Sequence, residues 1–77
     1  MFEYNICTEA DNNIYAKQCN ALEKRVPGIK KERELHDVDE SLICVYSLDG
    51  KSISVLNDET VGAVYIKSEV DLTPYFQ

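Results

Sequence analysis

The chemistry-bearing residues that stand closest together in this chain are His36 and the acids that follow it. Asp37, Asp39 and Glu40 place three carboxylates beside one imidazole within a few residues. The Asp-x-Asp start is shared with calcium-binding loops. However, Leu42 stands where such a loop needs its glycine, and no glutamate occupies the twelfth position. The stretch therefore predicts a charged turn between strands, and we expect neither a metal nor a cofactor.

Cys19 and Arg25 have the spacing of the phosphate-binding loop of protein tyrosine phosphatases, with five residues between them. In such a loop the backbone amides surround a phosphate, and the cysteine is a thiolate of lowered pKa. Here the intervening residues include no glycine and belong to a pattern that predicts a helix, whose amides bond within the helix. A cysteine on the buried stripe of a helix also behaves as a small apolar side chain. We therefore do not expect a phosphatase.

The other two cysteines, Cys7 and Cys44, bring the number to three at wide spacings, which predicts neither a disulfide framework nor a C-x-x-C redox pair. Cys44 is expected to face the core. Cys7 is the candidate reactive thiol, because it precedes a predicted helix whose dipole favours a thiolate. Cysteine usage, the lack of a signal-peptide pattern and the lack of a long apolar run predict a cytoplasmic protein that does not enter a membrane.

Other enzyme patterns are absent from the sequence. Ser41, His36 and several aspartates supply the residue types of a hydrolase triad, but the G-x-S-x-G pattern that exposes a serine nucleophile does not occur. The three glycines form neither a P-loop nor a dinucleotide-binding pattern. We therefore expect a non-enzymatic protein, with a small thiol- or metal-dependent enzyme as the alternative.

A strand and a helix are predicted at the start of the chain. Residues 2–6 alternate apolar and polar, which is the period of a half-buried strand. Thr8 is predicted as the N-cap of the helix, which ends before the Pro-Gly pair at 27–28. The side chains predicted to face the core from the strand are Phe2, Tyr4 and Ile6. The apolar stripe of the helix comprises Tyr15, Cys19, Leu22 and Val26.

A hairpin is predicted in the second half of the chain. Residues 42–48 and 51–56 flank Asp49-Gly50, whose residue types favour a type I′ turn, and a two-residue turn fixes the register. Residues 29–37 are predicted as a charged edge strand, with a short helix as the alternative, and residues 62–67 as the last strand. The face predicted to join the core carries Cys44, Tyr46, Ile53 and Val55. The opposite face carries Ile43, Val45 and Leu56.

These elements follow one another in the order β-α-β-β-β-β. The sequence thus predicts an α+β fold, in which one amphipathic helix packs on a four- to five-stranded antiparallel meander within a single domain of residues 1–77. Cystatin-like domains share this order of elements. The sequence contains no cystatin motif, so the similarity is one of architecture only and implies no function.

The net charge of −6 is distributed unevenly along the chain. Residues 1–33 contain five acids and six bases, whereas residues 34–77 contain nine acids and two bases. Direct binding of nucleic acid is not expected, because that affinity comes largely from cations placed against phosphates. An acidic surface would instead suit a basic protein, or would mimic nucleic acid in the groove of a protein that binds it.

One helix covers one face of the predicted sheet and leaves the other open. The apolar side chains of that second face are therefore covered either by the tail, through Leu72, Tyr75 and Phe76, or by a partner. We expect a protein-interaction module, an adaptor or an inhibitor, whose partner is another protein, with a homodimer as the alternative. The predicted contact residues are Ile43, Val45, Leu56, Tyr75, Phe76, Asp37, Asp39 and Glu40.

Overall fold

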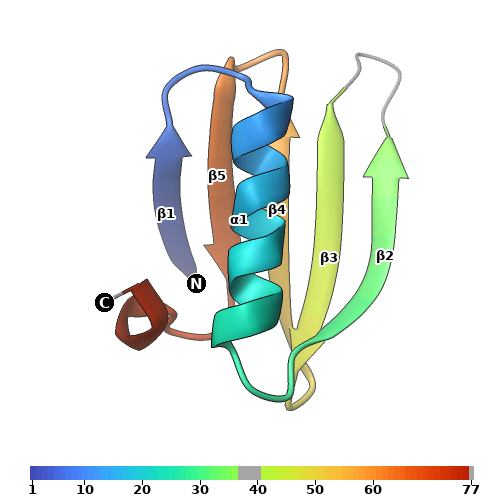
Figure 1. The fold of residues 1–77 in the computed structure, drawn as a ribbon, viewed down its shortest axis with the longest axis vertical. Coiled ribbons are helices and arrows are strands. Elements are labelled where there is room, and N and C mark those ends of the chain that lie inside the picture. Colours follow the sequence, from blue (N-terminus) through green and yellow to red (C-terminus); the bar gives the residue numbers. More distant parts are fainter. Residues whose placement is uncertain (37–40, 77) are drawn as a thin grey trace.

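One helix packs against a five-stranded antiparallel sheet (Figure 1). The computed structural model describes residues 1–36 and 41–76, and of Phe76 the backbone alone. The strand order is β1-β5-β4-β3-β2, so the two strands that flank the helix in sequence form opposite edges of the sheet. The predicted α+β fold and its order of elements are confirmed. The elements are β1 (Phe2–Cys7), α1 (Asn12–Arg25), β2 (Lys30–His36), β3 (Leu42–Leu48), β4 (Lys51–Asp58), β5 (Ala63–Ser68) and the 3-10 helix η1 (Thr73–Phe76).

The N-cap of α1 is Asp11, so the prediction of Thr8 is wrong. The Asp11 carboxylate accepts hydrogen bonds from the backbone amides of Asn13 at 2.8 Å and Ile14 at 3.1 Å. Aspartate caps a helix somewhat better than threonine, and Asp11 stands nearer the first turn of the apolar stripe. The stripe itself is confirmed, since all four of its members are buried. They are Tyr15, Cys19, Leu22 and Val26.

The β3–β4 hairpin has the predicted register. Asp49 and Gly50 have φ angles of 52° and 79°, which are the left-handed values that a type I′ turn requires at both positions. Tyr46 lies opposite Ile53, and this pair is fully buried beneath the helix. Because side chains alternate along a strand, this register turns Val45 to the opposite face of the sheet. The predicted edge strand is β2, which pairs with β3 and is exposed along its whole length.

β1 is the other edge, and here one prediction fails. Tyr4 and Ile6 pack against the margin of the core as expected, but Phe2 is 43% exposed. The helix packs closest to β4, in the middle of the sheet, so the first residue of an edge strand lies beyond its cover. A bulge between Asn5 and Cys7 also interrupts the pairing of β1 with β5.

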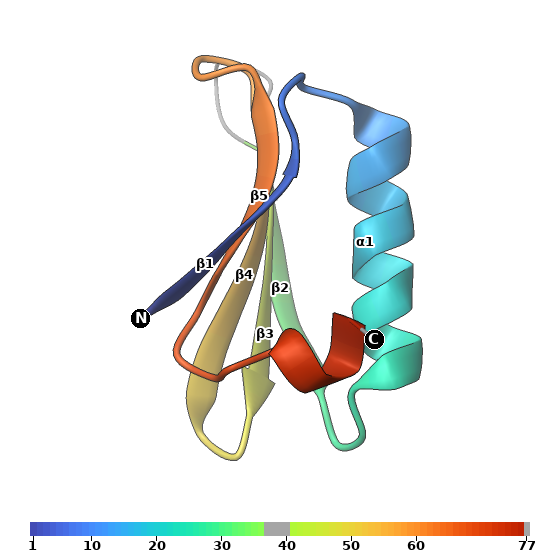
Figure 2. The ribbon, with the colours of Figure 1, turned by 90° about the vertical axis from the view of Figure 1, so that its left-hand side faces the viewer.

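The C-terminal tail lies on the same side of the sheet as α1 (Figure 2). Leu72 is fully buried in the core, and its amide donates a 2.8 Å hydrogen bond to the Tyr4 hydroxyl. That hydroxyl donates in turn to Asp71 at 3.1 Å, which ties the tail to β1. Of the two covers predicted for the opposite face, the tail is therefore ruled out as far as its described residues go.

The burial of the helix stripe can be tested by substituting one of its residues. Leu22 is 1% exposed, so Leu22→Ala should lower the free energy of unfolding by about 2–5 kcal/mol, through lost burial and the cavity left behind. A fall of that size approaches the whole stability of a small domain. Urea unfolding followed by circular dichroism measures the difference.

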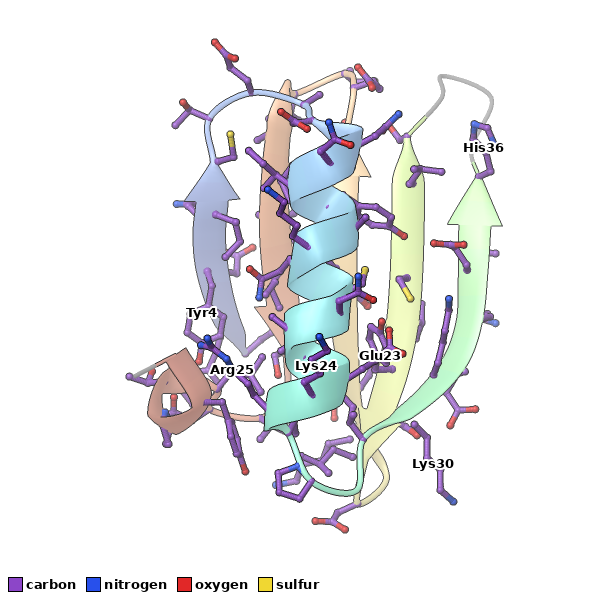
Figure 3. The ribbon with its side chains drawn as sticks, in the orientation of Figure 1. Tyr4, Glu23, Lys24, Arg25, Lys30 and His36 are labelled. Carbon is purple, nitrogen blue, oxygen red and sulfur yellow. The ribbon has the colours of Figure 1, made fainter. Side chains whose placement is uncertain are left out.

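The matched control is Lys24→Ala, because Lys24 is exposed on the outer side of the helix (Figure 3). It should change stability by about 0.5 kcal/mol or less. Glu23 is unsuitable as a control, since its carboxylate accepts a 2.7 Å hydrogen bond from the Tyr46 hydroxyl. Equal losses from Leu22→Ala and Lys24→Ala would contradict the packing described here.

Candidate interaction surface

The sheet face opposite α1 carries a row of large apolar side chains that crosses four strands. Residues directly opposite each other on antiparallel strands point to the same face. The register of β2, β3, β4 and β5 therefore aligns one apolar residue from each strand. From β2 to β5 these residues are Leu35, Ile43, Leu56 and Tyr65, which we call the apolar strip.

No described element covers this strip, because α1 and η1 both lie on the other side of the sheet (Figure 2). Leu35 is 45% exposed on the edge strand, whereas the other three members are half-buried between neighbouring strands. Val61, in the β4–β5 connection, is 69% exposed and lines a hollow of about 180 Å³ with Ile43 and Leu56. The apolar surface thus extends from the edge of β2 to the end of β4.

A second row lies beside the strip on the same face, and it carries charges at its ends. The register aligns one residue from each of the five strands, and Val45 adds an apolar side chain next to the strip. Glu3 and Lys67 form a 3.9 Å ion pair in which both side chains are well exposed, so the pair contributes little to stability. From β1 to β2 the row consists of Glu3, Lys67, Ser54, Val45 and Arg33, and we call it the charged row.

Two further acidic side chains near the open face accept hydrogen bonds from neighbouring residues. The Glu32 carboxylate accepts a hydrogen bond from the Ser47 hydroxyl. The Asp58 carboxylate accepts one from the Tyr65 hydroxyl at 3.2 Å and another from the amide of Val61 at 3.1 Å. Burial raises the pKa of Tyr65, and the neighbouring Asp58 carboxylate raises it further. These acids are already partnered within the face, so they are not a free anionic surface.

The structure brings together three of the predicted contact residues and separates a fourth. Ile43, Val45 and Leu56 share the open face, as the hairpin register predicts. Tyr75 lies on the helix side, where it packs against the margin of the core. Asp37, Asp39, Glu40 and the side chain of Phe76 lie outside the described residues. Sequence reasoning missed Leu35, Val61 and Tyr65.

Tyr75 instead lines a groove of about 310 Å³ between α1 and η1. Its apolar lining includes Ile14 and Leu22 of the helix, and Lys17 and Arg25 supply cations to it. Figure 3 shows Arg25 on the side of the helix that faces η1. This groove and the apolar strip lie on opposite sides of the sheet, so a single flat partner could not contact both.

Two buried tyrosines connect α1 to the sheet. The Tyr15 hydroxyl donates to the Glu34 carboxylate at 2.8 Å, and the Tyr46 hydroxyl donates to Glu23 at 2.7 Å. Burial raises the pKa of Tyr15, and its bond to Glu34 raises it further. Burial likewise raises the pKa of Tyr46, with contributions from Cys44 and Glu23. Both phenols therefore stay protonated in the folded state and hold the helix against β2 and β3.

The three thiols differ in their burial. Burial raises the pKa of Cys19 to about 11, and Cys44 is fully buried. Cys7 is half-buried at the end of β1, and α1 begins only at Asn12. The reason predicted for its reactivity, a position at the helix N-terminus, is therefore wrong. Cys7 remains the most accessible of the three free thiols.

The described residues include no group of three or more histidine, cysteine, aspartate or glutamate side chains that could hold a metal ion. His36 is exposed at the end of β2 (Figure 3), and the acids that follow it lie outside the described range. Within the described part of the chain, no helix is long and apolar enough to cross a membrane. Comparison with protein-family models, curated proteins and solved structures found no match for this chain.

Thiol labelling tests the placement of the cysteines. In the native protein a maleimide should modify Cys7 first, whereas Cys19 and Cys44 should react on the order of a hundredfold more slowly, because they need local opening. Mass spectrometry of peptides from a labelling time course identifies the site. Cys7→Ser serves as the control and should abolish the fast phase. Fast labelling of Cys19 would contradict its burial.

The buried tyrosines predict how stability depends on pH. Because the folded-state pKa values of Tyr15 and Tyr46 lie above their usual value of about 10, the folded state binds more protons at high pH. Their contribution is therefore fully present below about pH 10 and is lost as the pH rises beyond it. Cys19 acts in the same direction from its ordinary value of 9.0. Tyrosinate absorbance should rise together with the loss of circular dichroism, and ionisation of every tyrosine before unfolding would contradict this.

Proposed function

We propose that the protein is a non-enzymatic protein-interaction module that binds its partner through the open sheet face. The observation that carries this proposal is the apolar strip, which runs across four strands without a cover among the described residues. A small domain needs most of its apolar side chains for its own core. This one nevertheless turns Leu35, Val61 and part of Tyr65 toward water.

The physical gain from covering the strip is of the same order as the cost of association. Removing about 200–300 Å² of apolar surface from water contributes roughly 5–8 kcal/mol, at about 25 cal/mol per Å². Association costs several kcal/mol in lost translational and rotational freedom, so the strip alone would support a modest affinity. The charged row borders the strip, and its charges would set the orientation of the partner more than its affinity.

The module would act as an adaptor or an inhibitor in the cytoplasm. Three cysteines without a disulfide agree with a reducing compartment. The alternative role, an acidic mimic of nucleic acid, has less support from the geometry. Glu23, Glu34 and Asp58 accept hydrogen bonds from tyrosine hydroxyls, so part of the acidic excess serves the fold itself.

Substitution on the open face tests this function. A partner captured from native extract by the wild-type chain should be lost with Leu35→Asp, which places a charge in the strip on an exposed edge strand, and with Val45→Asp. It should be retained with Asn20→Asp, an exposed position on the outer side of α1. A photo-reactive residue at position 61 should cross-link to the same partner, and one at position 20 should not.

Salt titration separates this contact from an electrostatic one. A partner held by apolar contact should stay bound as the ionic strength rises from about 0.05 to 0.5 M, whereas a partner held by carboxylates should be released. Circular dichroism confirms that each variant is folded. Capture that survives both Leu35→Asp and Val45→Asp would contradict the proposal.

A further inference from the structure

The geometry points to a second copy of this chain as the partner of the open face. We propose a symmetric dimer in which two sheets pack face to face, with the twofold axis running between them along the direction of β4. This inference rests on the proposed function, because it uses the same strip and names its occupant. Three features of the face support it: the layout of the strip, the layout of the charged row, and the area available.

The inner part of the strip is arranged about the central strand of the sheet, because Ile43 and Tyr65 flank Leu56 on either side. β4 is third in the order of five strands, and it contributes Leu56 to the strip. A twofold axis along β4 therefore places Leu56 against its own copy and Tyr65 against the partner's Ile43. Leu35, at the margin of the strip, falls opposite the partner's Asn5 in β1. Bulky and branched side chains would thus alternate across the interface. Two sheets with aligned strands pack in this way about 10 Å apart in β-sandwiches.

The charged row is self-complementary about the same axis. It is centred on Ser54 of β4, with the Glu3 carboxylate at one end and the Arg33 guanidinium at the other. Rotation about β4 brings Glu3 opposite the partner's Arg33, and symmetry makes this pair twice. Lys67 falls opposite the partner's Val45, where its alkyl stem can pack while its ammonium stays near Glu3. Two chains of net charge −6 can then meet without opposing like charges in this row.

Self-association through the exposed edge strand is disfavoured by contrast. In a symmetric antiparallel pairing one residue of β2 must lie directly opposite its own copy. At Lys31, Glu32, Arg33 or Glu34 that would oppose two like charges, which destabilises a strand pair. The charges of β2 thus disfavour these four registers of edge-to-edge pairing, whereas the open face opposes no like charges in the charged row.

The area of the open face determines the affinity expected for the dimer. Five strands spaced about 4.8 Å apart, each about 20 Å long, cover about 500 Å² per chain. Two copies would bury about 1,000 Å² in total, which is near the lower limit for a specific interface. The dimer should therefore be reversible and dependent on concentration, with exchange between monomer and dimer in the micromolar range or above.

A charge exchange tests the dimer and its axis together. Sedimentation of the full chain should shift from monomer to dimer as its concentration rises. Arg33→Glu would oppose two glutamates, and Glu3→Arg would oppose two arginines, so each should raise the dissociation constant about tenfold or more. The double variant with both substitutions restores opposite charges and should return the constant to within about threefold of wild type.

Lys51→Glu is the matched control. It changes the net charge by the same amount as Arg33→Glu but lies beside the β3–β4 turn, opposite Leu48 and away from the open face. It should leave the dissociation constant near the wild-type value. Circular dichroism and thermal unfolding verify that each variant keeps its fold, so a loss of dimer cannot be mistaken for unfolding.

Three other outcomes would contradict the dimer itself, the surface that forms it, or its twofold axis. A chain that stays monomeric up to millimolar concentration overturns the dimer, while strip-dependent capture of another protein would still support the proposed function. A dimer that survives both Leu35→Asp and Arg33→Glu uses a different surface, which also overturns it. A dimer that Leu35→Asp disrupts but the double charge exchange does not restore has a different axis, and the arrangement about β4 is then wrong.

Discussion

The rest of the structure depends on one constraint: a single helix can cover only one face of a five-stranded sheet. The helix packs over β4 and buries the apolar side chains that point toward it, including Tyr46, Ile53 and Val55. The tail adds Leu72 to this same side. Both covering elements are thus used on one face, and the alternate side chains of each strand remain on the other. An open face follows from the number of elements and the period of a strand.

The helix is also narrower than the sheet. At the margins of the core, tyrosine hydroxyls make polar contacts where the helix does not cover the sheet. Tyr15 and Tyr46 each bury an aromatic ring while their hydroxyls reach Glu34 and Glu23. On the other margin, the Tyr4 hydroxyl accepts a hydrogen bond from the Leu72 amide. Each tyrosine supplies an apolar ring to the core and a polar group to its edge. Carboxylates bound in this way support the fold and are withdrawn from the acidic surface.

The sequence predicted what depends on local chemistry and missed what depends on the register of strands that no tight turn connects. The Asp49-Gly50 turn fixes the hairpin register, and with it the face of Ile43, Val45 and Leu56, because a two-residue turn leaves no freedom of alignment. Leu35 and Tyr65 join these residues through the registers of β2 with β3 and of β5 with β4, and these registers are not fixed by a two-residue turn. Thr8 failed as the N-cap because two competent caps stand close together. The side taken by the tail depends on a contact between β1 and residues 71–72, which are far apart in sequence.

The placement of charge on this chain is compatible with the proposed association through the open face. A net charge of −6 keeps separate molecules apart over distances of about a Debye length, so random contacts between chains are suppressed. On the open face, however, Lys67 accompanies Glu3, Arg33 stands at the opposite end of the row, and Asp58 is bonded to Tyr65. In the proposed dimer these contacts would offset part of the repulsion between two acidic chains. Under the proposed function, a chain with this distribution would resist non-specific association and would accept only a surface that matches both the strip and the charges beside it.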